Sequence, residues 1–93
     1  MARRVVWSAR ALRDVETIAE YIARDSPTYA GSVVKKIIAQ TRILARFPSA
    51  GRKVPEFDDE TMREVFAYSD RVIHRLEKDE VLIAAVIHGK RNL

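Results

Sequence analysis

The sequence contains no cysteine, which excludes disulfide bridges, thiolate zinc sites and cysteine nucleophiles. Glycine and proline are scarce, at three residues each, and no glycine-rich phosphate-binding loop occurs. No apolar run approaches the roughly 18 residues of a membrane-spanning helix, and the basic N-terminus lacks the hydrophobic stretch of a signal peptide. With 93 residues the chain has room for one domain, over residues 1–93. The absences predict that this domain is soluble, and we expect it in the cytoplasm and without a cofactor.

Arginine, by contrast, is abundant. The chain carries 17 Lys+Arg against 13 Asp+Glu, a net charge of +4, and twelve of these cations are arginine. A planar guanidinium group binds phosphates and carboxylates through paired hydrogen bonds. The charge therefore favours nucleic acid or an acidic protein segment as a partner. Many small soluble domains are basic without binding nucleic acid, so the charge alone leaves both alternatives open.

Two amphipathic helices are predicted in the first half of the chain. The first begins after Ser8, whose hydroxyl can cap it, and ends before Asp25 because of the nearby proline. The second begins with Ser26 as cap and Pro27 in its first turn, and ends at Phe47. Apolar residues recur at helical spacing, in the first helix as Leu12, Val15, Ile18, Ala19 and Ile22. The connection of about two residues predicts an antiparallel hairpin.

Four strands complete the predicted fold. They are expected at residues 3–7, 63–68, 71–77 and 81–88, with a surface loop over residues 49–61. The last strand is the longest apolar run, which suits a place inside a sheet. The order β-α-α-β-β-β predicts an α+β fold: an antiparallel helix hairpin packed on one face of a small antiparallel sheet. The other face is expected to be open.

The residues that could carry chemistry are basic. Alternation along the strand places Arg71 and Arg75 on one face, and Arg63 begins the neighbouring strand. Lys90 and Arg91 follow the last strand, from where they could reach the same face. Such a cluster can hold a phosphate and stabilise charge that develops on it. The alternative is that these are solvent-facing residues that protect a sheet edge from aggregation.

Other kinds of site have weaker support. The histidines, His74 and His88, lie on adjacent predicted strands, and no carboxylate has the spacing of a metal ligand. We therefore predict no metal site. The carboxylates of Asp58, Asp59 and Glu60 lie in the predicted loop, where a solvated run is a better interpretation than an acid/base pair.

Several segments, taken in order, resemble the RelE/ParE superfamily of bacterial toxins. Residues 7–15, WSARALRDV, resemble the opening of that family, and PSAGRKVPE at 48–56 is similar to its P-x-x-G-R-x-V-P-E connection. Residues 63–65, REV, are similar to the R-E strand start. DRVIHR at 70–75 resembles the Y-R-I-x-Y-R strand, and VIHGKR at 86–91 resembles the terminal V-x-H-G-x-R. The resemblance covers essentially the whole chain and implies the same fold.

The resemblance implies the toxin of a type II toxin–antitoxin module. RelE-like members cleave messenger RNA in the ribosome through basic residues, whereas ParE-like members poison DNA gyrase. Arg71 and Arg91 fall on the two arginine positions of the ribonucleases, and Arg63 corresponds loosely to their lysine-bearing strand. Their terminal tyrosine has no counterpart in a chain that ends at Leu93.

The V-P-E and H-G-x-R signatures favour the ParE-like branch, and hence gyrase as the target. We expect Arg63, Arg71, Lys90 and Arg91 to bind the target, with no residue assigned to catalysis. The expected partner is a cognate antitoxin with an acidic, amphipathic segment that folds onto this domain to form a hetero-oligomer. DNA would be contacted only through that complex. The alternatives are a ribosome-dependent messenger RNA interferase using Arg71 and Arg91, or a non-toxic antitoxin-binding or co-repressor protein.

Two positions depart from the ParE-like pattern. Asp70 and His74 stand where tyrosines are usual in the family. Both replacements make this strand more polar. We expect them either to weaken toxicity or to tune the protein to a particular antitoxin.

Overall fold

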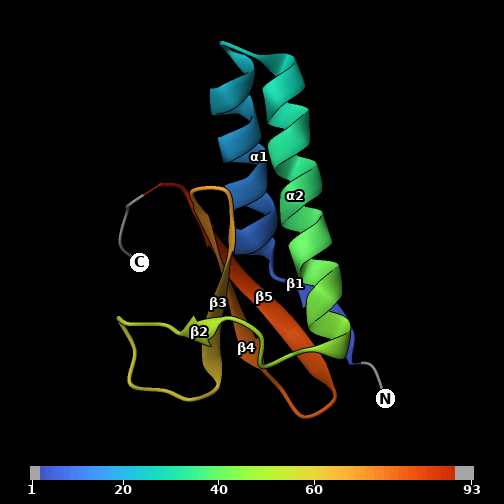
Figure 1. Cartoon of the computed structure of the whole chain (residues 1–93), viewed down its shortest axis with the longest axis vertical. Coiled ribbons are helices and arrows are strands. Elements are labelled where there is room, and N and C mark those ends of the chain that lie inside the picture. Colours follow the sequence, from blue (N-terminus) through green and yellow to red (C-terminus); the bar gives the residue numbers. More distant parts are fainter. Residues whose placement is uncertain (1–2, 90–93) are drawn as a thin grey trace.

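The computed structural model describes residues 3–89, which form a helix hairpin over a five-stranded sheet (Figure 1). The elements in chain order are β1 (Arg4–Trp7), α1 (Ala9–Ala23), α2 (Pro27–Arg46), β2 (Arg52–Lys53), β3 (Met62–Ala67), β4 (Asp70–Leu76) and β5 (Glu80–Ile87). The predicted α+β class is confirmed. Over the described range, neither helix has the length and apolar character needed to cross a membrane.

Both helices begin at the serines that the sequence indicates. Ser8 Oγ accepts a hydrogen bond from the Ala11 amide at 3.0 Å, and Ser26 Oγ accepts one from the Tyr29 amide at 3.1 Å. Pro27 occupies the first turn of α2, where its missing N–H costs nothing. The short connection between the helices folds them back on each other, so the predicted hairpin is confirmed.

The predicted apolar face of α1 is wrong at Leu12, whose surface is 53% exposed. The helix presents Ala11 and Ile18 to the core instead, and Asp14 on the same side accepts a hydrogen bond from the Val86 amide at 2.8 Å. These three positions are spaced by three and four residues and therefore share one face. A polar side chain thus takes a place towards the sheet that a hydrophobicity pattern reserves for an apolar one.

The sheet is mixed, with strand order β1-β5-β4-β3-β2. Strand β1 runs parallel to β5, with Val5 opposite Val81, and the other three pairs are antiparallel. The prediction of a wholly antiparallel sheet is therefore wrong. The chain closes the sheet by pairing its first strand with its last, and no local pattern encodes the direction of that pairing. The two-residue strand β2 lies within the predicted loop 49–61 and is too short to show an alternating pattern.

The main core lies between the helices and the sheet. Its fully buried members include Ile37 and Leu44 from α2, and Val72, Val81 and Ile83 from the sheet. This arrangement confirms that the hairpin covers one face. The inner placement of β5, between β1 and β4, is also confirmed.

The opposite face of the sheet was predicted to be open, and this prediction is wrong. Val54, which follows β2, is fully buried against Met62, Ile73, Ala85 and Ile87. The segment after β2 therefore packs onto this face, and the green-to-yellow loop in Figure 1 projects from the β2 side of the sheet. Apolar side chains on β4 and β5 favour such a cover because burying them removes their surface from water.

Strand β5 contains one irregularity. Ile73 pairs with Ala85 and the next residue, His74, pairs with Ile83, so Ala84 is left without a partner. This is a β-bulge, in which one extra residue interrupts the alternation of side chains. Before it, Ile83 joins the core under the helices, and after it Val86 does. The unpaired Ala84 carbonyl accepts a hydrogen bond from Ser8 Oγ at 2.9 Å.

Candidate functional site

Arg71 lies on the sheet face directed away from the helices, where only 8% of its surface is exposed. Its Nε donates to Glu64 Oε1 at 2.8 Å, and its Nη1 and Nη2 donate to the two carboxylate oxygens of Glu56 at 2.8 and 2.7 Å. The hydrogen bonds to Glu56, together with those to Glu64 and the negative charges of both groups, raise the pKa of Arg71, although burial opposes this. Two carboxylates therefore hold the guanidinium group in place.

Glu64 joins Arg71 to a second arginine. The Glu64 side chain is fully buried. Its Oε1 accepts from Arg71 Nε, and its Oε2 accepts from Arg52 Nε. The Arg52 guanidinium carbon also lies 5.5 Å from the centre of the Phe66 ring, a cation–π geometry. A buried carboxylate is tolerated when its charge is paired in this way. The cluster of Arg52, Glu56, Glu64 and Arg71 has no formal net charge.

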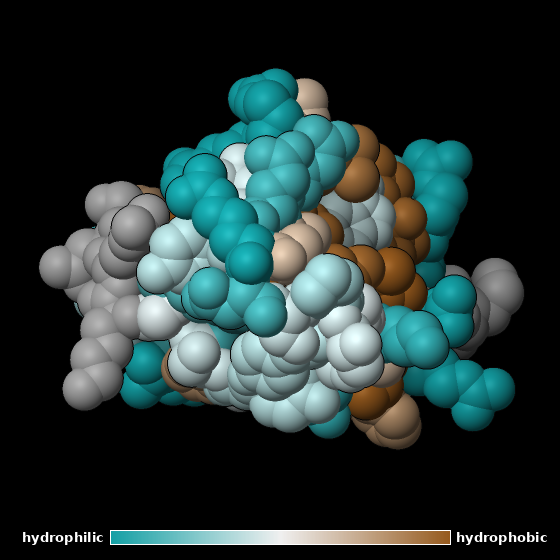
Figure 2. All heavy atoms as spheres, turned by 90° about the horizontal axis from the view of Figure 1, so that it is seen from above, coloured by the Kyte–Doolittle hydropathy of each residue, from teal (hydrophilic) through white to brown (hydrophobic). Residues whose placement is uncertain are grey.

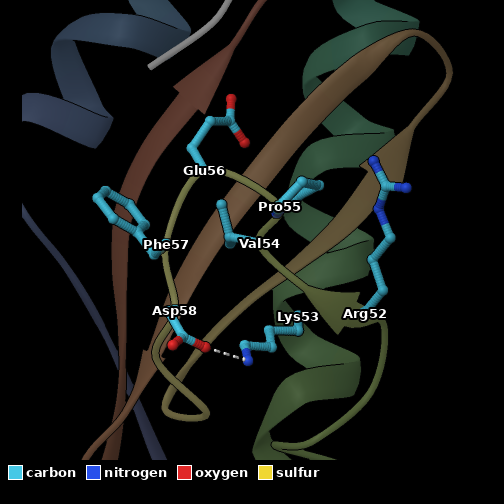
Figure 3. A pocket seen from close by; sticks show the side chains of 7 residues that line it. All are labelled: Arg52, Lys53, Val54, Pro55, Glu56, Phe57 and Asp58. Atoms are coloured by element: carbon cyan, nitrogen blue, oxygen red, sulfur yellow. Dashed lines mark hydrogen bonds and ion pairs between the residues drawn. The ribbon is translucent and has the colours of Figure 1, made fainter.

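Strand β2 and the loop after it, together called the loop of residues 52–58, border this cluster and line a surface hollow of about 540 Å³ (Figure 3). Lys53 Nζ lies 2.9 Å from Asp58 Oδ1, and Figure 3 shows this pair at the opposite end of the loop from Glu56. The hydrogen bond and the charge of Asp58 raise the pKa of Lys53, and the same contact lowers the pKa of Asp58. The ion pair bridges the two ends of the loop that carries Glu56 to Arg71.

The structure separates the arginines that the sequence analysis grouped. Arg63 is the direct cross-strand partner of His74, on the helix side of the sheet, and its Nη2 lies 3.7 Å from Glu60 Oε2. Arg75 lies on the face of Arg71 and is exposed, with its Nε 3.4 Å from Met62 Sδ. Two other basic residues were predicted to bind the target, Lys90 and Arg91. Both lie outside the described residues.

Both residues that replace family tyrosines make internal hydrogen bonds. His74 is fully buried, its Nε2 donates to the Pro48 carbonyl at 3.0 Å, and burial lowers its pKa. Asp70 is 2% exposed, and its Oδ1 lies 2.6 Å from His88 Nδ1. His74 thus ties β4 to the segment after α2, and Asp70 ties the start of β4 to the end of β5. Within residues 3–89 no three potential metal ligands come together.

Glu56 and Glu64 were not predicted as site residues, although both lie in the motifs that resemble the toxin family. The signal that could have found them is the arrangement of charge across the strands. Glu64 lies diagonally across from Arg71 on one face of the β3–β4 pair, and opposite charges at such positions attract. The contact between Glu56 and Arg71 could not be predicted this way, because Glu56 lies in a loop and not on a paired strand.

The fold is that of the RelE/ParE-type toxins. A chain of the chromosomal ParDE toxin–antitoxin system from P. aeruginosa superposes with a TM-score of 0.78 at 18% identity, covering 96% of this chain and 98% of that chain. A YoeB/ParE toxin from Agrobacterium tumefaciens gives a TM-score of 0.65 at 17% identity, covering 91% and 96%. These likenesses establish the architecture.

The sequence identifies the family within that class. Residues 5–93 match the family described as the ParE toxin of the type II toxin–antitoxin system parDE. A putative toxin, Y4kP, from Sinorhizobium fredii is 36% identical over 88 residues, covering 94% of this chain and 88% of that protein. Toxin RelE2 from Caulobacter vibrioides is 31% identical, covering 94% and 96%. The chain belongs to the ParE toxin family, which confirms the resemblance found in the sequence.

Proposed function

We propose that this protein inhibits bacterial growth by poisoning DNA gyrase in the cytoplasm. The observation that carries the proposal is that Arg71 is buried and paired with two carboxylates. Glu56 and Glu64 already compensate its positive charge, so binding a scissile phosphate would require it to give up short, charge-assisted hydrogen bonds. This supports a structural role for Arg71, which holds the loop of residues 52–58, over a role in phosphate chemistry.

The two histidines support the same preference. Messenger RNA cleavage needs a group that accepts a proton and one that donates it near the reacting phosphate. His74 is buried under the helices with a lowered pKa. His88 contacts Tyr21 of α1, on the opposite face of the sheet from Arg71. Neither imidazole therefore lies beside Arg71, and we assign gyrase contact to Lys90 and Arg91, with Arg63 as a further contact.

We infer that a cognate antitoxin neutralises this protein by docking on the helix hairpin. The loop after β2 covers part of the other sheet face, so the outer groove between α1 and α2 offers the better apolar surface. Lys35 and Glu20 border the groove, which measures about 490 Å³ and is lined by the small apolar residues Ala19, Ala23, Ala30 and Val34. An amphipathic antitoxin helix suits such a groove, and its acidic face suits a chain of net charge +4.

Co-expression with the product of the adjacent gene tests the antitoxin proposal. A complex and a higher melting temperature are expected, because a ligand that binds the native state stabilises it by mass action. Ala23→Glu, in the groove, is expected to prevent the complex, whereas Ala39→Glu, at an exposed position of α2 outside the lining residues, is expected to leave it intact. Equal binding by both variants would place the antitoxin elsewhere. DNA is proposed to be contacted only through this hetero-oligomeric complex.

The second candidate function is ribosome-dependent messenger RNA cleavage. It is favoured by the 31% identity to a relative named toxin RelE2 and by the match of Arg71 and Arg91 to the arginine positions of RelE-like ribonucleases. The third is a non-toxic antitoxin-binding or co-repressor protein. Induced expression in a bacterium separates the three, by scoring gyrase-dependent chromosome breaks, codon-specific messenger RNA cuts and colony survival. Breaks without cuts are expected, whereas cuts that disappear in Arg71→Ala would overturn the gyrase proposal.

A further inference from the structure

All three tyrosines of the chain meet at one end of the molecule. Tyr21 in α1, Tyr29 in α2 and Tyr68 in the β3–β4 turn line a single hollow of about 330 Å³. Figure 2 looks down on the end where the helices connect, and side chains of intermediate hydropathy, white to pale teal, gather there in a continuous area. The Arg71 cluster does not contribute to this hollow.

The rings are arranged in two pairs. Tyr29 and Tyr68 have ring centres 6.2 Å apart and ring planes tilted by 44°. Tyr21 and His88 have ring centres 5.8 Å apart and ring planes tilted by 60°. Each tyrosine remains more than half exposed, at 59%, 51% and 55% for Tyr21, Tyr29 and Tyr68. Four separate parts of the fold thus supply aromatic rings to one place, and much of each tyrosine is left for contact with a ligand.

The charge of the hollow is opposite to that of the whole chain. The lining contains the carboxylates of Asp25 and Asp70 but no lysine or arginine. Asp70 is buried and bonded to His88, whereas Asp25 is exposed and forms no ion pair among residues 3–89. A cation gains from both the aromatic rings and the carboxylate, whereas a phosphate would meet the Asp25 charge. The hollow therefore selects a positively charged ligand.

The backbone at Tyr68 is a further sign of use. Its φ angle is +55°, in the left-handed region that bulky residues rarely occupy. Asparagine and glycine adopt this conformation at lower cost and are the usual residues of two-residue hairpin turns. The chain nevertheless places a large aromatic side chain here, against Tyr29. Strained residues of this kind are concentrated at ligand contacts and active sites.

We propose that this hollow binds the guanidinium group of an arginine side chain presented by a protein partner. The planar group stacks on the tyrosine rings, and its N–H groups donate to the Asp25 carboxylate. Guanidinium suits the site better than ammonium, because it is planar, stacks on aromatic faces and is more weakly hydrated. The hollow would thereby recognise a basic residue of the partner, whereas the net charge of +4 of this chain favours acidic partners. The proposal does not depend on gyrase being the target of the toxin.

The tyrosines provide a local readout for the test. Because every tyrosine of the chain lines the hollow, ring signals of the purified protein, labelled at tyrosine for NMR, report on this site alone. The probe is N-acetyl-arginine amide, compared with the lysine analogue and with the citrulline analogue, which has nearly the same shape and no charge. Saturable shifts with a millimolar dissociation constant are expected for arginine, weaker ones for lysine and none for citrulline. Equal shifts with arginine and citrulline would overturn the proposal.

Two variants and a control test the contacts. Asp25→Asn is expected to weaken arginine binding about two- to fivefold, the range of exposed ion pairs, and Tyr29→Leu to weaken it by a similar or larger factor. Asp79→Asn removes an exposed carboxylate in the β4–β5 connection and is expected to change nothing. Unchanged binding in Asp25→Asn, or saturable shifts with a mononucleotide and none with arginine, would overturn the assignment. Gyrase plays no part in this measurement, so its outcome and that of the gyrase proposal are separable.

Discussion

Glu64 and Arg71 lie diagonally across the β3–β4 pair, with Glu64 Oε1 2.8 Å from Arg71 Nε and both side chains nearly inaccessible to solvent. The two charges can be buried because they compensate each other and because Glu56 and Arg52 complete their hydrogen bonding. The pair fixes β3 to β4 on the face away from the helices. It also supports our proposal that Arg71 is structural in this chain, although the resemblance matches it to an arginine position of the ribonucleases.

Removing Glu64 is expected to cost substantial stability. Glu64→Ala would leave Arg71 with one carboxylate and Arg52 with none, and breaking a buried ion pair costs about 3 kcal/mol or more. Urea unfolding of the purified chain measures the change. Glu60→Ala, which removes a carboxylate that is 76% exposed, is the matched control and is expected to cost less than about 1 kcal/mol. A loss below about 1 kcal/mol for Glu64→Ala would contradict the structural role.

His74 is expected to make the protein less stable in mild acid. Burial lowers the pKa of His74 in the folded state, so the unfolded chain binds a proton more readily. Stability is therefore present above the ordinary histidine pKa and is lost as the pH falls below about 6.5, by at most about 1.4 kcal/mol per pH unit. Unfolding of the native protein and His74→Gln, each at about pH 7.5 and about pH 5.5, measures the effect. An equal loss in both proteins would show that other groups cause it.

Tyr68 is expected to lower the stability of the fold through its backbone conformation and to contribute to ligand binding in the tyrosine hollow. Tyr68→Asn places a residue that tolerates the left-handed conformation at φ +55° and is expected to raise the free energy of unfolding by about 0.5–1 kcal/mol while abolishing one wall of the tyrosine hollow. Thermal unfolding and the arginine titration are measured on the same sample. Tyr68→Phe, which keeps both strain and ring, is expected to change neither. A destabilised Tyr68→Asn would mean that the contact with Tyr29 outweighs the strain.

Gly51 is expected to tolerate no side chain. Its φ is +85°, and a Cβ added there would lie 2.0 Å from the Glu64 carbonyl oxygen, so β2 would have to move from β3. We expect Gly51→Ala to cost more than about 2 kcal/mol. Gly31→Ala, in α2 with nothing within 4 Å of the added Cβ, is expected to stabilise by up to about 1 kcal/mol. Melting temperatures of the two variants should therefore shift in opposite directions.

Arg91 is expected to act on the target and not on the fold. Arg91→Ala should leave the free energies of unfolding and of antitoxin binding unchanged within about 0.5 kcal/mol, while lowering growth inhibition and gyrase-dependent DNA breaks. Arg42→Ala, at an exposed position of α2, is the control and should leave killing intact. Normal killing by Arg91→Ala at normal expression would move the target surface elsewhere, and the helix hairpin would be the next surface to test.

The features that the sequence predicted are those with local causes. Ser8 and Ser26 cap the helices through hydrogen bonds that span three residues, so the sequence indicates both helix starts. The direction of β1 was missed because its partner begins 76 residues later, at Glu80. The burial of Arg71 was missed for a related reason: its partners lie 7 and 15 residues away, and the nearer one acts across a strand pair. Alternation predicted the face of Arg71 correctly but says nothing of what covers that face.

The bulge at Ala84 divides β5 into two half-strands of opposite phase. If the same residues continued in strict alternation after Ile83, with no bulge, Ile87 would face the helices and His88 the opposite side, exchanging an apolar and a polar side chain between two environments. As built, Ile87 packs beneath the sheet with Val54, and His88 reaches Tyr21 and Asp70. The bulge therefore determines which side chains of the second half of β5 face the helices. Straightening the bulge without removing a residue would turn His88 away from the tyrosine hollow without changing the identity of any residue.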